Sequence, residues 1–323
     1  MPRTRPPAFA RPWFVAALGA AAWLLGVSGT ARAEGVPWRT DFDAASTDPA
    51  AAAGPSDTLL LFTGSDWCPP CIKLEEGVFS DPVAGAAIAA AFVPVMLDFR
   101  RADPPPPAEV ARNEALMARY APQPAFPTLV LVDPEGRPYA ATGYEAEIVE
   151  RGPMAYVEHL LALQGVRERR DAALAEAKTL DGLEKAKALD AAVGEIDAAL
   201  VAKHYADVVD QILELDPDDT AGLKAKYESA RAEQELQAAI PGIVRGMQEG
   251  RLDEGIAVVD GLIEKYDPSG EALMTLELIK GQAYGLQQNA DAAAAAFDRA
   301  LAADPQNPGA DEIRAMKARF TRE

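Results

Sequence analysis

The chain has 323 residues, 49% of them hydrophobic, which is enough to build two separate cores. Its 50 acidic and 31 basic side chains give a formal net charge of −19. This charge disfavours nucleic acid and anionic membrane surfaces as partners, because both are bound mainly through clusters of Lys and Arg.

The first residues have the features of an export signal. Three arginines precede an apolar run over residues 13–27, and a small-residue segment, Ala-Arg-Ala at 31–33, follows it. The run is shorter than the roughly 20 apolar residues that span a membrane, and this order is typical of a cleaved signal peptide. We predict that residues 1–33 are removed and that the protein is periplasmic or otherwise exported, with no stable membrane span. An uncleaved anchor is the alternative.

The next segments predict alternating strands and helices. The apolar run 58–62 has the length of a buried parallel strand and leads directly into two cysteines. A Pro-rich stretch at 103–107 is predicted to be a surface loop. The other expected elements are a short helix within 34–57, helices from the cysteines to about 78 and over 81–91, 108–120 and 145–163, and strands over 92–99, 128–132 and 139–142. This order predicts an α/β domain over residues 34–164, with a mixed sheet flanked by helices.

The second half of the chain predicts only helices. From residue 165 to 323 the composition shifts to Ala, Glu, Lys and Leu with helical periodicity, and three Asp-Pro pairs each end an amphipathic helix. The last unit carries residues at the offsets of a tetratricopeptide repeat: Gly281, Tyr284, Ala293, Phe297, Ala300 and Pro305. The earlier units fit more loosely, so we predict an irregular, tetratricopeptide-like array. Such an array presents a concave surface for a protein partner, although it could equally serve only to dimerise the protein or to shield an active site.

The two cysteines of the chain, Cys68 and Cys71, lie three residues apart at the start of a predicted helix. A cross-link over so short a loop removes little entropy from the unfolded chain, which argues against a purely structural disulfide. Unpaired N–H groups and the helix dipole favour a thiolate at Cys68, and Cys71 lies one turn further in. We predict that Cys68 is the nucleophile and Cys71 the resolving thiol, with no cofactor besides this pair. Pro69 and Pro70 suit the first turn of a helix.

A metal site is the competing interpretation of two cysteines at this spacing. Zinc would need two further ligands, and the chain offers only His159 and His204, both in helices predicted far along the sequence. We expect both histidines to be ordinary surface or packing residues and predict no metal site. Transient copper binding by the two thiols stays an alternative.

The segment LFTGSDWCPPCIKLE at residues 61–75 resembles exported bacterial members of the thioredoxin superfamily that carry a Gly-Ser-Asp-Trp-Cys-x-x-Cys signature. The similarity covers about residues 38–163. It implies a thioredoxin-like fold in which the two cysteines exchange disulfides with protein thiols. It also implies that Trp67 is the tryptophan of the signature and that Pro127 is the cis-proline of the family. The backbone of Phe126 would then be available to pair with a substrate strand.

One departure from thioredoxin concerns proton transfer. Thioredoxin carries a buried Asp six residues before its first cysteine, and this chain has Phe62 there. Glu75, Asp98 or water would have to assist the resolving thiol instead. We expect Asp66 to be a loop or helix-start residue rather than a general base.

The direction of electron flow is predicted from the residues between the cysteines. Strong oxidants of this fold tend to have a histidine there, which stabilises the thiolate and hence the reduced form. Its absence favours a reductase or isomerase that acts on protein disulfides and is itself supplied by a reducing electron donor. The alternative function is a periplasmic adaptor, in which the helical array binds a partner and the thiol pair is secondary.

Overall fold

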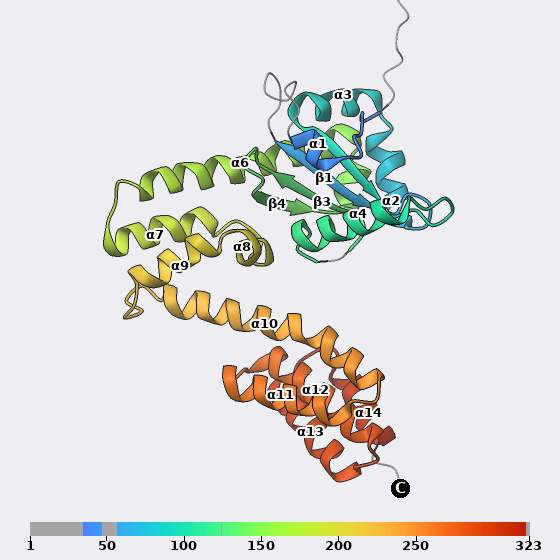
Figure 1. The fold of residues 1–323 in the computed structure, drawn as a ribbon, viewed down its shortest axis with the longest axis vertical. Helices are drawn as coiled ribbons and strands as arrows, with labels where there is room; N and C mark the ends of the chain where they lie inside the picture. The colour runs from blue at the N-terminus through green and yellow to red at the C-terminus, as the bar shows by residue number, and fades with distance from the viewer. Residues whose placement is uncertain (1–34, 47–56, 124, 321–323) are drawn as a thin grey trace, which may run out of the picture.

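The computed structural model describes residues 35–46, 57–123 and 125–320, so the predicted export signal at 1–33 lies outside the described residues. A four-stranded mixed sheet organises the first half of the chain (Figure 1). In spatial order β2-β1-β3-β4, β1 runs parallel to β2, and β3 runs antiparallel to both of its neighbours. The strands are β1 (Thr58–Thr63), β2 (Val93–Asp98), β3 (Thr128–Val132) and β4 (Pro138–Thr142).

The two central strands are buried along their whole length, which explains their unbroken apolar sequence. Because successive side chains of a strand point to opposite faces, each central strand contributes to two cores. Leu59 and Leu61 belong to one core, and Leu60 and Phe62 to the other. The sheet is therefore covered on both faces.

Helices cover each face of this sheet. The first face packs against α2 (Pro69–Leu74), the π-helical turn η2 (Glu75–Phe79), α3 (Pro82–Ala91) and α6 (Pro153–Ala177). The second face packs against α1 (Phe42–Ser46) and α4 (Pro107–Tyr120). Residues 103–106 lie outside regular structure, as predicted, whereas Pro107, the last residue of the predicted loop, opens α4.

The prediction of a single helix over residues 145–163 is wrong in two respects. The structure has a short helix α5 (Ala146–Glu150), then a break at Gly152, whose φ is +105°, and then α6 with Pro153 in its first turn. Both residues favour a break between two helices over one continuous helix. At its other end α6 continues through the expected domain boundary at 164/165. Gly165 does not end the helix, because a single interior glycine costs only about 1 kcal/mol and α6 packs on the sheet before it and on α7 after it.

After α6, helices are the only regular elements in the described residues. They are α7 (Gly182–Val193), α8 (Ala198–His204), α9 (Ala206–Leu215), α10 (Leu223–Gln248), α11 (Leu252–Tyr266), α12 (Gly270–Leu286), α13 (Ala290–Ala303) and α14 (Ala310–Phe320). The helices α9, α11 and α13 each end just before an Asp-Pro pair, as predicted. Figure 1 shows the long α10 leading from the α7–α9 group to the α11–α14 group.

The helices α12 and α13 pack closely through small residues. A Cβ atom added at Gly281 would lie 2.7 Å from the ring of Phe297, so α12 and α13 approach at this glycine. Ala293, Phe297 and Ala300 are buried in the same core. This is the packing expected of the repeat pattern, and the assignment to tetratricopeptide repeats stays a prediction. Among the described residues, no helix is both long and apolar enough to cross a lipid bilayer.

Buried polar groups attach the helical region to the sheet. The Arg170 guanidinium of α6 lies 2.8 Å from the Asp133 carboxylate and donates to the Tyr205 hydroxyl at 2.7 Å. The Tyr205 hydroxyl in turn donates to the carbonyl of Pro138 at 3.0 Å. One turn earlier on α6, Arg167 pairs with the buried Asp57. These contacts attach α6, and Tyr205 between α8 and α9, directly to the sheet and its flanking residues.

The attachment lies at the far end of the sheet from the cysteines. Thr58 at the start of β1 is paired with Val132 at the end of β3, and the anchoring carboxylates flank this pair in sequence. The cysteines follow the opposite end of β1. The described contacts of α8 and α9 therefore do not support the alternative that the helical array shields the cysteines.

Candidate active site

The two cysteines stand at the beginning of α2, directly after the loop that leaves β1. Cys68 is the N-cap residue, with an extended backbone at φ −98° and ψ 105°, and Pro69 opens the helix. Cys68 and Cys71 are joined by a disulfide, with their Cα atoms 5.3 Å apart. The structure thus places the predicted nucleophile at the helix N-terminus and the predicted resolving thiol one turn inside, as their spacing implies.

Phe126 and Pro127 lie against the cysteine pair, although they are far away in sequence. The Sγ atom of Cys68 is 3.6 Å from the carbonyl oxygen of Phe126, and the Phe126–Pro127 peptide bond is cis. Cys68 is only 4% exposed and Cys71 3% exposed. A client sulfur must therefore approach the disulfide between the side chains that rim it.

Aromatic rings form one side of this rim. The Trp67 indole donates from Nε1 to the carbonyl of Phe99 at 2.8 Å, and its ring meets that of Phe126 edge-on, with centroids 5.4 Å apart. A Cβ at Gly64 would lie 2.5 Å from the indole, so the glycine of the sequence signature leaves room for the tryptophan. Trp67 is therefore held in place immediately before Cys68.

Asp66 holds the loop that follows β2 against the site. Its carboxylate accepts hydrogen bonds from the backbone N–H groups of Arg101 and Ala102. These bonds, that of Ala102 first, lower the pKa of Asp66 below its usual value, so it is an ionised acceptor. The expectation of a loop residue rather than a general base fits this geometry.

The two carboxylates considered as proton acceptors for Cys71 make hydrogen bonds elsewhere. Asp98 accepts from the backbone N–H and the hydroxyl of Ser65, at 3.1 and 2.6 Å. Glu75 accepts from the Ser80 hydroxyl at 3.1 Å, and burial raises the pKa of Glu75. Phe62 is fully buried in the second core.

Gly143 and Tyr144 close the other side of the site. A Cβ at Gly143 would lie 3.0 Å from the carbonyl oxygen of Pro127, and the Tyr156 hydroxyl donates to the Gly143 carbonyl at 2.6 Å. Lys73 of α2 places its Nζ atom 6.0 Å from the centre of the Tyr144 ring. The contact between Lys73 and Tyr144 and the position of Arg101 over Trp67 are two features that the sequence interpretation missed. Their only signal in the sequence was one basic residue just after the cysteines, Lys73 in α2, and another just after β2, Arg101.

The two histidines pack between elements. His159 Nε2 lies 2.9 Å from the Thr142 hydroxyl, and His204 Nε2 lies 2.8 Å from the carbonyl of Arg119. The His204 ring also stacks on that of Tyr120, with centroids 5.5 Å apart. Both act as packing residues, as expected.

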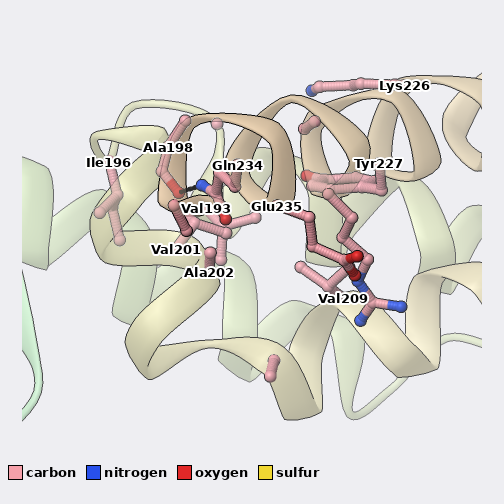
Figure 2. A pocket seen from close by; sticks show the side chains of 15 residues that line it. Val193, Ile196, Ala198, Val201, Ala202, Val209, Lys226, Tyr227, Gln234 and Glu235 are labelled. Atoms are coloured by element: carbon pink, nitrogen blue, oxygen red, sulfur yellow. Dashed lines mark hydrogen bonds between the residues drawn. The ribbon is translucent and has the colours of Figure 1, made fainter. Parts of the chain in front are cut away.

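A cavity of about 510 Å³ lies in the helical region, between α10 and the helices α7 to α9 (Figure 2). Val193, Val201 and Val209 line its apolar wall, and Figure 2 shows Tyr227 and Gln234 of α10 on the opposite side. A charged side chain at the edge of the cavity pairs with another residue of the chain, because Arg231 forms an ion pair with Asp210. This is a concave surface of the kind that the partner-binding alternative requires.

Comparisons with known proteins identify a thioredoxin-like domain in the first half of the chain. Residues 45–148 match the family model described as a thioredoxin-like domain. The chain is 34% identical over 86 residues to the disulfide bond reductase DsbH of Chlamydia pneumoniae. These aligned residues are 27% of this chain and 51% of that protein. The chain thus matches about half the length of this curated relative. A solved structure titled DsbH oxidoreductase is 27% identical, with 41% of this chain and 85% of that chain covered and a TM-score of 0.35.

The matched residues include the sheet, the cysteine pair and the cis-proline described above. The helices from α7 onward lie outside the family match. The chain therefore contains a thioredoxin-like domain with a mixed sheet flanked by helices, followed by a helix-rich region.

Proposed function

We propose that the chain is a thiol–disulfide oxidoreductase that acts on protein disulfides, with Cys68 as nucleophile and Cys71 as resolving thiol. The observation that carries the proposal is the Cys68–Cys71 disulfide at the N-terminus of α2, with the Phe126 carbonyl 3.6 Å from the outer sulfur. The similarity to a protein named as a disulfide bond reductase supports the same chemistry. Trp67, Pro69, Pro70 and Pro127 shape the site around the sulfurs.

The reaction proceeds in two exchanges. In the reduced protein the Cys68 thiolate attacks one sulfur of a client disulfide, forming a mixed disulfide and releasing the other client sulfur as a thiolate. Cys71 then loses its proton and attacks the Cys68 sulfur, which closes the Cys68–Cys71 disulfide and releases the second client thiol. The client gains two electrons and two protons. A dithiol donor must then reduce the pair again.

Reduction or isomerisation is the proposed direction. Pro69 and Pro70 place no cation between the cysteines, so the thiolate of Cys68 depends on the helix N-terminus. A less stabilised thiolate corresponds to a less oxidising pair. We also propose that the protein works after export, in the periplasm or a similar compartment, on the basis of the signal-like residues 1–33.

The Cys71→Ala variant is expected to accumulate clients as mixed disulfides on Cys68, because the resolving step has been removed. Non-reducing gels of cells that express this variant should show adducts that disappear after dithiothreitol treatment, and mass spectrometry should identify the clients. The control variant, Cys68→Ser with Cys71→Ala, has the same resolving defect without the nucleophile and should show no adducts. Equal adduct patterns from both variants, or none from either, would count against the assigned roles.

The second candidate function is that of an adaptor, favoured by the cavity between α10 and α7–α9. Replacing Ala202 on its wall by Arg would fill the cavity with a charged side chain. If the cavity recruits clients, this substitution should reduce the yield of the mixed disulfides without changing the reduction of a small peptide disulfide. An unchanged adduct yield would assign client recognition to the cysteine domain alone.

A further inference from the structure

Basic side chains stand at the rim of the Cys68–Cys71 disulfide, in a chain whose acids outnumber its bases by 50 to 31. The Arg101 guanidinium lies 3.9 Å from the centre of the Trp67 ring, next to the nucleophile. On the far side Lys73 approaches Tyr144. Within the described part of the chain, neither Arg101 nor Lys73 forms an ion pair. Arg112 and Arg137 of the same domain, by contrast, pair with carboxylates.

The contact with Trp67 leaves the hydrogen-bonding capacity of Arg101 available. A guanidinium that stacks on an aromatic ring uses its flat face, whereas its five N–H donors lie in its plane. Arg101 is exposed, so these donors are accessible to solvent beside Trp67. A carboxylate is the group that matches this donor arrangement best, because it can accept two parallel hydrogen bonds.

The position of Arg101 is fixed by two independent contacts. Its backbone N–H donates to the Asp66 carboxylate, and its side chain rests on the adjacent Trp67. Of the nearby acids, Asp66 accepts from the backbone N–H groups of this loop and also attracts Arg101 electrostatically, and Asp98 accepts from the backbone N–H and the hydroxyl of Ser65. Arg101 is therefore a preorganised positive charge at the edge of the site. Little side-chain entropy is lost when it binds an anion.

We propose that Arg101 is a specificity-determining residue that selects client disulfides with an acidic side chain beside the cysteine. The proposal rests on the thiol–disulfide exchange proposed above and names the class of client for that site. A carboxylate next to the client cysteine would bind Arg101 while the sulfur lies between Trp67 and Phe126. Lys73 adds charge of the same sign on the opposite side, which speeds the encounter with an acidic segment.

The test uses the pre-reduced full-length protein and two synthetic peptides, each closed by one disulfide. The peptides are identical except that Glu flanks both cysteines in one and Lys flanks them in the other. Rate constants for reduction are measured at low and at physiological salt. The variants are Arg101→Gln, Arg101→Lys and, as a matched control, Arg314→Gln, which removes an exposed arginine from α14.

The wild-type protein should reduce the acidic peptide about tenfold faster than the basic peptide at low salt, with a smaller ratio at high salt. Arg101→Gln should bring the ratio close to one, Arg101→Lys should keep most of it, and Arg314→Gln should leave it unchanged. A purely structural role for Arg101 would lower both rate constants by the same factor and leave the ratio intact, which would overturn the proposal. So would a wild-type ratio of one. If the wild-type protein reduces neither peptide, the oxidoreductase proposal itself fails.

Discussion

Replacing Cys68 by alanine is expected to reduce the rate at which the protein catalyses insulin disulfide reduction by at least about 1,000-fold, to the background rate of the dithiothreitol donor. The reason is that, in the proposed reaction, the Cys68 sulfur at the N-terminus of α2 forms the covalent bond with the client. Cys71 lies one turn inside the helix, so its sulfur lacks the N-cap position that favours the thiolate of Cys68. Turbidity from precipitating insulin chains measures the rate.

The control for this experiment is Ser229→Ala, an exposed position on α10 that should retain the wild-type rate. Far-UV circular dichroism should confirm that both variants are folded. Full activity of Cys68→Ala would eliminate the oxidoreductase proposal. Equal inactivity of the wild type and the variant would favour the adaptor instead.

The second large effect is expected at Arg170, which joins α6 to the sheet. Its side chain is 5% exposed and that of its partner Asp133 is 2% exposed. The substitution Arg170→Met leaves the Asp133 carboxylate buried without its cation, and the Tyr205 hydroxyl loses a donor. Such a change should lower the free energy of unfolding by about 3–5 kcal/mol. Urea denaturation followed by circular dichroism measures this loss.

Arg169 provides a matched control, because it is the adjacent residue of the same helix and pairs with Glu195 on the surface. Arg169→Met should cost less than about 1 kcal/mol. The double variant of Arg170→Met with Asp133→Leu should recover part of the lost stability, since no unpaired charge then remains. Equal losses for the two single variants would show that the contact between Arg170 and Asp133 does not anchor the helical region.

Features encoded locally could be predicted from the sequence. The apolar run of β1, the glycine and tryptophan before Cys68, and the prolines after it each specify their own conformation with little help from distant residues. The contact between the Phe126 carbonyl and the Cys68 sulfur spans 58 residues, and only the family resemblance predicted that this segment lies there. The break at Gly152 was missed because the apolar pattern continues on both sides of it.

Other contacts between distant segments could not be predicted. Arg101 lies beside Trp67 because the Asp66 carboxylate binds the loop after β2, and nothing in either segment indicates that pairing. The course of α6 beyond residue 164 depends on α7 and on the buried Arg170, so the composition shift at Gly165 gave the wrong end for this helix. Tertiary contacts decide both cases.

The most direct test of the central claim is a single-turnover experiment on the full-length protein. Pre-reduced protein is mixed with one equivalent of a disulfide peptide, quenched with an alkylating agent and analysed by mass spectrometry. The account predicts that each closed Cys68–Cys71 disulfide is matched by two new peptide thiols. Peptide that stays oxidised while both cysteines remain alkylatable would contradict it.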